Sequence, residues 1–307
     1  MDSLILRSLK ILSPKPNPFD LLRIGGNRDG AYLIPNCLEG ISDCFSPGVD
    51  NFKRFEDELV TKYKIKSHLC DKSSDPELFQ TPIIKNWQTF QNKWLGSSLE
   101  DDSITLEEWV EKYACNSHEL ILQMDIEGAE YDVLSQISED LLKRFRIIII
   151  EFHNLHEILS KSKFSKDIYL SLKALSKNHT SVHLHPNNCE EAINVPTLNI
   201  NLPNVAEITF LRNDFMEAGQ KNQFVIVPNT NDIVSNVVFK KPIFLNKNWK
   251  KLNPKKIKIN HKKIIKDWLF YLLIITVVFL PMSFYNMLPH KPIYLRKISS
   301  FIRNFQF

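Results

Sequence analysis

Between residues 41 and 227, short apolar runs alternate with segments in which apolar residues recur every three or four positions. The short runs have the length of buried strands and predict strands at 41–45, 65–70, 120–124, 146–152, 181–184, 205–212 and 224–227. The longer segments predict helices at 51–63, 105–113, 131–145 and 154–178. Strands and helices in alternation predict an α/β fold, with a mostly parallel sheet covered by helices on both faces.

Polar residues stand directly after the first two predicted strands. In an open α/β sheet, ligands bind at the carboxyl ends of the strands, where loops and helix N-termini converge. The first strand runs into Ser46-Pro47-Gly48, a turn that suits a cofactor loop and equally an ordinary strand-to-helix connection. The second strand ends in Asp71, whose carboxylate suits either the two ribose hydroxyls of a nucleoside cofactor or the cap of a helix.

The strand predicted at 120–124 is followed by Asp125 at its tip and by two glutamates before the next helix. Acids in a first helical turn are stabilised by the helix dipole, which accounts for the later acids better than for Asp125. The next strand ends in Glu151-Phe152-His153, so the side chains of Glu151 and His153 point to the same side. We therefore expect Asp125, Glu151 and His153 to share one polar site.

Two further histidines, His183 and His185, alternate in a Val-His-Leu-His run at the end of another predicted strand. A single histidine is more often a structural residue than a ligand or a base. Three histidines at predicted strand ends, together with the two acids, favour a shared polar site.

Six stretches of the sequence carry a family resemblance. They are RIGGNRDGAYLIP (23–35), CFSPGVDNFKRFEDEL (44–59), ITLEEWVEKY (104–113), LILQMDIEGAEYDVL (120–134), IIIIEFHNL (147–155), and SVHLHPNNCEE followed by LPNVAEITFLR. In this order they resemble the FkbM-like methyltransferases, the last pair being similar to one branch of that family. The likeness places RIGGNRDGAY, by itself only a predicted turn, at the rim of a cleft.

The resemblance implies a class I methyltransferase fold, which is a Rossmann-like, mostly parallel sheet of seven strands, and S-adenosylmethionine as the cofactor. It places Gly48 and Glu56 in the cofactor loop region, Asp71 at the ribose and Asp125 facing the methyl donor. With the hydroxyl of the same loop, the expected cofactor-binding residues are Ser46, Gly48, Glu56, Asp71 and Asp125.

The predicted reaction is O-methylation of a hydroxyl on a sugar, lipid or secondary metabolite. An oxygen nucleophile must lose a proton, which a histidine of near-neutral pKa can accept. We predict that His153 or His185 is this base and that Asp125 or Glu151 orients it. The alternative is a divalent metal that lowers the pKa of the acceptor, with Asp125, Glu151, His153 and His183 as candidate ligands.

Two other functions fit parts of the pattern. A nicotinamide-dependent oxidoreductase also needs an acid after the second strand, but the chain has no GxGxxG. A membrane-tethered, non-catalytic Rossmann-like binding module is the non-enzymatic alternative.

Charge is distributed unevenly along the 307 residues. From Lys240 onward there are 15 Lys+Arg and one acid, against 24 basic and 34 acidic residues before it. A basic run beside an apolar segment suits an anionic membrane surface better than nucleic acid. Five scattered cysteines without a CxxC pair argue against a zinc ribbon or a disulfide framework and favour a reducing compartment.

Residues 268–288 carry no charged side chain and are long enough to cross a bilayer as a helix. The lysines before this segment predict membrane association with the catalytic domain facing the cytoplasm. If the tail packs on the protein instead, a soluble cytoplasmic protein is expected. The expected partners are a small-molecule, glycan or lipid-linked acceptor and a membrane.

The predicted parts are an N-terminal helix and linker (1–19), the methyltransferase domain (20–228), a basic linker (229–266) and a hydrophobic tail (267–307).

Overall fold

The computed structural model describes residues 2–98, 102–117, 119–160, 162–217, 232, 235–246 and 248–249. The chain divides into two compact units, Met1–Ile257 and Lys258–Phe307, and all described residues belong to the first. The predicted strand at 224–227 and the apolar segment at 268–288 lie outside the described residues. Within the described part of the chain, no helix is long and apolar enough to span a membrane.

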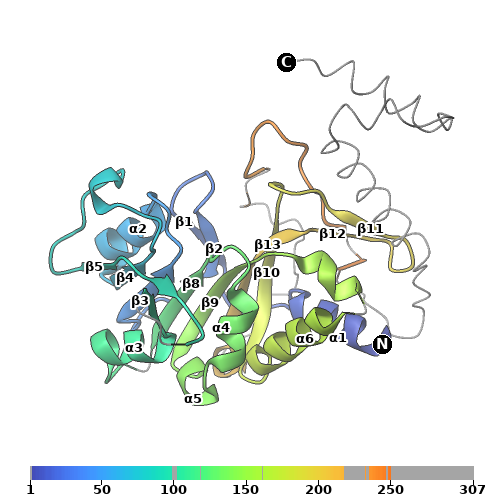
Figure 1. Ribbon diagram of the computed structural model, residues 1–307, viewed down its shortest axis with the longest axis horizontal. Helices are drawn as coiled ribbons and strands as arrows, with labels where there is room; N and C mark the ends of the chain where they lie inside the picture. The colour runs from blue at the N-terminus through green and yellow to red at the C-terminus, as the bar shows by residue number, and fades with distance from the viewer. Residues whose placement is uncertain are drawn as a thin grey trace, which may run out of the picture. The chain divides into compact units, whose positions relative to one another are not determined.

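A seven-stranded sheet forms the centre of the first unit (Figure 1). Its strands lie in the order β10-β13-β9-β8-β3-β4-β5. Their bounds are β3 (Asp43–Pro47), β4 (Lys66–Cys70), β5 (Gln88–Gln91), β8 (Leu120–Met124), β9 (Phe145–Phe152), β10 (His179–Asn187) and β13 (Val205–Arg212). The five strands from β9 to β5 are parallel to one another, whereas β13 runs antiparallel between β9 and β10. The predicted mostly parallel, seven-stranded sheet is therefore confirmed.

Six of the seven strands lie where the apolar runs predict them. The seventh, β5, has no counterpart in the prediction. Its sequence Gln-Thr-Phe-Gln contains one large apolar side chain, and three of its four residues are only partly buried. An edge strand of this kind needs no continuous apolar run, so the sequence carries little signal for it.

The helices are α1 (Asp2–Leu12), α2 (Arg54–Tyr63), α3 (Leu106–Ala114), α4 (Glu130–Gln136), α5 (Glu139–Leu142), α6 (Lys163–Leu175) and α7 (Asn213–Glu217). The prediction of one helix over 131–145 is wrong, because Ser138 is extended there and its hydroxyl caps α5 by accepting from the Leu141 N–H. The helix predicted over 154–178 begins only at α6, where Ser162 is the N-cap. A 3-10 turn, η2 (Leu155–Leu159), precedes it.

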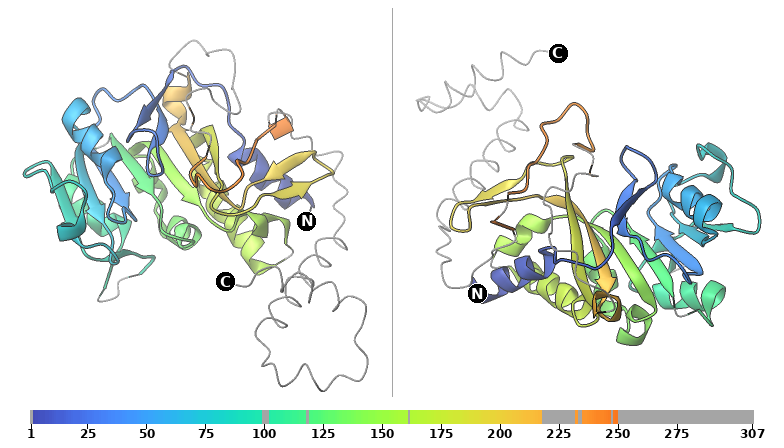
Figure 2. Two further views of the ribbon diagram at one scale, coloured as in Figure 1. Left: turned by 90° about the horizontal axis from the view of Figure 1, so that it is seen from above. Right: turned by 180° about the vertical axis from the view of Figure 1, so that it is seen from behind.

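Different elements cover the two faces of the sheet. On one face, α2 and the antiparallel hairpin of β1 (Leu21–Ile24) and β2 (Tyr32–Pro35) pack on a core that includes Ile121 and Ile149. On the other face, Phe45 of β3 meets Trp109 of α3 edge to face, with ring centroids 5.2 Å apart. There α4 packs against α6, and α1 lies alongside α6 (Figure 1, Figure 2). The N-terminal helix is thus part of the same packed unit as the sheet.

Smaller elements complete the described structure. They are η1 (Pro76–Leu78), the two-stranded pair of β6 (Trp94–Leu95) and β7 (Ser103–Ile104), and the hairpin of β11 (Ile193–Val195) and β12 (Ile200–Leu202). Trp249 is buried and donates its indole N–H to the Asn201 carbonyl of β12. The described residues of the predicted basic linker therefore pack on the same unit.

Candidate active site

The loops that follow β3 and β8 lie against each other at the carboxyl ends of these strands. The Asp125 N–H donates to the Pro47 carbonyl at 3.2 Å, and the Gly48 N–H donates to the Cys70 carbonyl at 2.9 Å. Gly48 has φ +79°, and a Cβ there would lie 1.5 Å from the carbonyl oxygen of Asp125. Only glycine fits this position, since it combines a left-handed backbone with a backbone-to-backbone contact.

Asp71 follows β4 and is buried. Its Oδ1 accepts hydrogen bonds from the Ser73 N–H at 2.8 Å and the Ser73 hydroxyl at 2.7 Å, which is a local turn contact. Its Oδ2 accepts from the Asp50 N–H at 2.9 Å and so ties the β4 loop to the β3 loop. A carboxylate oxygen has two lone pairs, and Oδ2 therefore keeps capacity for one ribose hydroxyl. This remaining acceptor fits a ribose hydroxyl in the nucleoside part of S-adenosylmethionine.

Ser46 and Glu56 belong to a buried network on the α2 face of the sheet. The Ser46 hydroxyl contacts a carboxylate oxygen of Glu56 and lies 2.5 Å from Oε1 of Gln123. Gln123 in turn donates to the Tyr32 hydroxyl at 2.9 Å. Burial raises the pKa of Glu56 to about 7, and a protonated Glu56 completes the chain by donating to Ser46. Both side chains are buried, so they stabilise the loop through contacts inside the protein. Their predicted contact with the cofactor stays a prediction.

Asp125 and His153 meet where the neighbouring parallel strands β8 and β9 end. The Nε2 atom of His153 lies 4.0 Å from Oδ1 of Asp125 and 3.4 Å from Oε2 of Glu127. The same nitrogen lies 3.9 Å from Oε1 of Glu151. The structure thus brings together the three residues for which the sequence predicts a shared site.

Glu130 holds the other side of the His153 ring. Its Oε1 lies 3.0 Å from His153 Nδ1 and accepts the Gly128 N–H at 2.9 Å, and its side chain is fully buried. Burial and the neighbouring Glu127 and Glu130 raise the pKa of Asp125, while His153 opposes this shift. Burial opposes a charge on His153, but Glu130 and Asp125 raise its pKa.

A second acidic group lies on the hairpin-covered side of the same strand ends. One carboxylate oxygen each of Asp29, Glu151 and Glu207 lies within 4.8 Å of the others. The Asn187 amide donates to Glu151 at 2.9 Å, and the Asn236 amide donates to both Asp29 and Glu207, at 2.6 and 2.7 Å. Asp29 belongs to the loop of the β1–β2 hairpin, which confirms that this loop reaches the strand ends.

His183 and His185 pair with Asp232. The Nε2 atom of His183 lies 3.2 Å and the Nδ1 atom of His185 lies 3.4 Å from Oδ1 of Asp232. Burial opposes a charge on His185, but Glu207 and Asp232 raise its pKa to about 9. The imidazole of His185 is therefore protonated on both nitrogens and positively charged at neutral pH.

The candidate metal ligands predicted from the sequence do not form one set. Among the described residues, Asp125 and His153 share a group with Glu127, whereas Glu151 shares a group with Asp29 and Glu207. His183 belongs to neither group and pairs with Asp232.

The members of this site that the sequence did not predict are Asp29, Glu127, Glu130, Glu207 and Asp232. One signal was available for Glu207, which is an acid inside the otherwise apolar strand run VAEITFL. Asp29 lies in RIGGNRDGAY, the stretch that the resemblance places at the rim of a cleft, although nothing singles out its carboxylate. Nothing in the local sequence marks Asp232.

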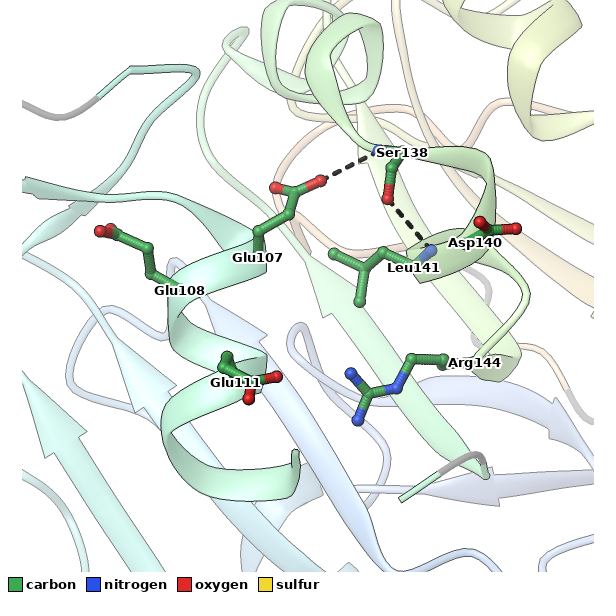
Figure 3. Close-up of a pocket in the computed structure, with 7 residues that line it drawn as sticks. All are labelled: Glu107, Glu108, Glu111, Ser138, Asp140, Leu141 and Arg144. Atoms are coloured by element: carbon green, nitrogen blue, oxygen red, sulfur yellow. Dashed lines mark hydrogen bonds between the residues drawn. The ribbon is translucent and has the colours of Figure 1, made fainter. Parts of the chain in front are cut away.

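A groove of about 580 Å³ lies elsewhere, between α3 and α5 (Figure 3). It is lined by Glu107, Glu108, Glu111, Ser138, Asp140, Leu141 and Arg144. The Arg144 carbonyl accepts the Leu120 N–H at the start of β8, so the groove lies near the amino ends of the strands. It is therefore separate from the candidate site at their carboxyl ends.

A seven-stranded sheet with one reversed strand beside its edge, and with acids after its second and fourth strands along the chain, is a class I methyltransferase fold. The family model of the methyltransferase FkbM domain matches residues 49–174, which contain Asp71, Asp125, Glu151 and His153. This match, which covers less than half of the chain, supports an FkbM-like methyltransferase domain that uses S-adenosylmethionine.

Solved structures with detectable similarity are distant. A chain of a fibrillarin/Nop5p complex is 10% identical, with 57% of this chain and 74% of that chain covered and a TM-score of 0.34. A 16S rRNA (adenine(1408)-N(1))-methyltransferase from Catenulisporales acidiphilia is 8% identical, with 63% and 98% covered and a TM-score of 0.27. A search of curated proteins gives no significant match.

Proposed function

We propose that the protein methylates a hydroxyl oxygen of a small-molecule, glycan or lipid-linked acceptor. The observation that carries this proposal is the position of Asp125 and His153, side by side at the ends of β8 and β9. A hydroxyl is a poor nucleophile until it loses its proton. A cluster of proton-accepting groups beside the methyl donor therefore suits an oxygen acceptor.

When bound, S-adenosylmethionine supplies a methyl group whose bond to sulfur breaks, leaving the electron pair on sulfur, as the new bond to oxygen forms. The chain's own residues have to orient the acceptor and take its proton. Two groups are placed to accept it, His153 through Nε2 and Glu151 through its carboxylate, whose pKa is raised well above the usual value by burial and the neighbouring Asp125. His185 is less suited because its pKa of about 9 keeps it protonated.

The second acidic group supports an acceptor that carries several hydroxyls. Carboxylates of Asp29 and Glu207 and the amides of Asn187 and Asn236 lie next to Glu151, so hydrogen-bond donors and acceptors alternate there. Such donors and acceptors suit hydrogen bonds to an acceptor that carries several hydroxyls. A lipid-linked acceptor would also agree with the apolar segment predicted at 268–288.

The test is isothermal titration of the purified full chain with S-adenosylmethionine and, separately, with NAD. We expect S-adenosylmethionine to bind, and Asp71→Asn to weaken binding about 10–100-fold because a charge-assisted hydrogen bond to the ribose is lost. Asp132→Asn, an exposed acid of α4, is the matched control and should bind like the parent. Binding of NAD alone would refute the proposal. Methyl transfer is then tested with a panel of hydroxylated acceptors, and the release of S-adenosylhomocysteine is measured.

A further inference from the structure

We infer that Asp125, Glu127 and His153 form a binding site for one divalent cation, with Glu130 as the residue that orients the histidine. The inference rests on the proposed function only for the use of the cation, which is to hold and acidify the acceptor hydroxyl. The binding site itself follows from the geometry of these four side chains.

The three ligand atoms are spaced for a single ion. His153 Nε2 lies 3.4 Å from Glu127 Oε2 and 4.0 Å from Asp125 Oδ1, and one ligand atom of each residue lies within 4.8 Å of the others. An ion with bonds of about 2.1 Å holds its ligand atoms about 3.0–4.2 Å apart, depending on the angle between them. The two distances from the histidine fall in that range.

Glu130 fixes the histidine as a ligand. Its Oε1 accepts from His153 Nδ1 at 3.0 Å, so the ring presents the lone pair of Nε2 toward Asp125 and Glu127. The Gly128 N–H donates to the same oxygen at 2.9 Å and holds Glu130 in place. A buried carboxylate behind a histidine is the usual arrangement by which proteins fix the orientation of a metal-binding imidazole.

Two buried oxygens of the cluster lack a hydrogen-bond partner among the described residues. They are Oδ1 of Asp125 and Oε2 of the fully buried Glu130. Carboxylate oxygens of Asp125, Glu127 and Glu151 lie within 4.0 Å of His153 Nε2. Nε2 lies 4.0 Å from the Asp125 oxygen and 3.4 Å from the Glu127 oxygen, and both distances exceed the 2.7–3.2 Å of an N–H···O hydrogen bond. A proton on Nε2 would therefore form no good hydrogen bond to either carboxylate. A single cation between Asp125, Glu127 and His153 gives Oδ1 of Asp125 the partner that it lacks and lies on the lone-pair side of His153 Nε2.

Two carboxylates and one imidazole are a mixed oxygen and nitrogen donor set, which suits Mn²⁺ or Mg²⁺ better than a thiolate-binding metal. Three protein ligands leave further positions for oxygens of water or of the acceptor. With His153 holding the ion, Glu151 is the group that takes the acceptor's proton, and its Oε1 lies 3.9 Å from His153 Nε2. The cation thus decides between the two proton acceptors.

The full chain is first freed of metal with EDTA and dialysis. Mn²⁺ is then added, and its binding is measured by the decrease in the electron paramagnetic resonance signal of free Mn²⁺. We expect one Mn²⁺ per chain. Glu127→Gln should weaken binding at least 10-fold, and because Glu127 is exposed, this variant should fold like the parent. Glu130→Gln should weaken it about 10-fold through the histidine. Asp132→Asn changes the net charge equally on the same helix and should bind like the parent.

The inference is overturned if Mn²⁺, Mg²⁺ and Zn²⁺ all fail to bind at one saturable site, or if Glu127→Gln binds as tightly as the parent. Titration with S-adenosylmethionine in EDTA separates this result from the proposed function. Cofactor binding without metal binding refutes the cation site alone, and metal binding without cofactor binding refutes the methyltransferase proposal while leaving the site.

Discussion

Gly48→Ala tests whether the contact between the β3 and β8 loops is as tight as the structure shows. The added Cβ would lie 1.5 Å from the Asp125 carbonyl oxygen and 2.6 Å from its carbonyl carbon, whereas real Cβ contacts essentially never fall below 3.0 Å. The two loops must therefore separate by about 1.5 Å, since both contacting atoms belong to backbone. Gly30→Ala is the matched control, because Gly30 has a similar φ of +74° and nothing within 4 Å of its Cβ position.

The magnitude follows from two terms. A left-handed backbone costs a residue with a Cβ about 1–2 kcal/mol, and both variants carry this cost. Gly48→Ala also strains the hydrogen bonds from Asp125 to Pro47 and from Gly48 to Cys70. A buried polar group left unpaired costs about 1–3 kcal/mol, so Gly48→Ala should lose about 3 kcal/mol more than the control.

Urea unfolding followed by circular dichroism measures this difference, and thermal melting checks it. At about 2–4 °C per kcal/mol for a domain of this size, Gly48→Ala should melt about 6–12 °C below Gly30→Ala. Its affinity for S-adenosylmethionine should also fall, because the loop that carries Asp125 is displaced. If the two variants unfold within about 0.5 kcal/mol of each other, the close approach of the loops is refuted.

Two predictions concern the pH dependence of stability. Burial raises the pKa of Glu56 to about 7 from 4.5, so ionising it destabilises the fold as the pH rises through this range. Glu56→Gln keeps a donor to Ser46 and should unfold with a free energy up to about 3 kcal/mol above that of the parent at pH 8. At pH 4 it should be no more stable than the parent. Equal stability of the two proteins at pH 8 would contradict the burial of this charge. Burial lowers the pKa of His179 to about 4 from 6.5, so the free energy of unfolding should fall by up to about 3 kcal/mol as the pH drops between these values. His179→Gln, which still donates to the Phe145 carbonyl, should reduce this slope in urea titrations at each pH, and an unchanged slope would assign it to other groups.

Much of the sheet could be predicted from the sequence because its central strands are buried on both faces. A strand such as β9, whose eight residues are all buried, contains four consecutive isoleucines at 147–150, and this apolar run is visible without a structure. The ligand-binding edge follows from the same pattern, since parallel strands bring their carboxyl ends together. For this reason Asp125, Glu151 and His153 could be grouped in advance. The edge strand β5, which is half-exposed, left no such pattern.

The roles of individual acids required the tertiary structure. In the sequence, Glu130 has the position of an acid stabilised by a helix dipole, yet its carboxylate contacts His153, which lies 23 residues further along the chain. Glu207 lies opposite Glu151 only because β13 pairs with β9 in an antiparallel register. Local sequence determines which residues are buried strands and which are strand ends. Long-range strand pairing and packing determine which of those strand ends bring charged side chains into contact. These contacts determine the chemistry at Asp125 and His153.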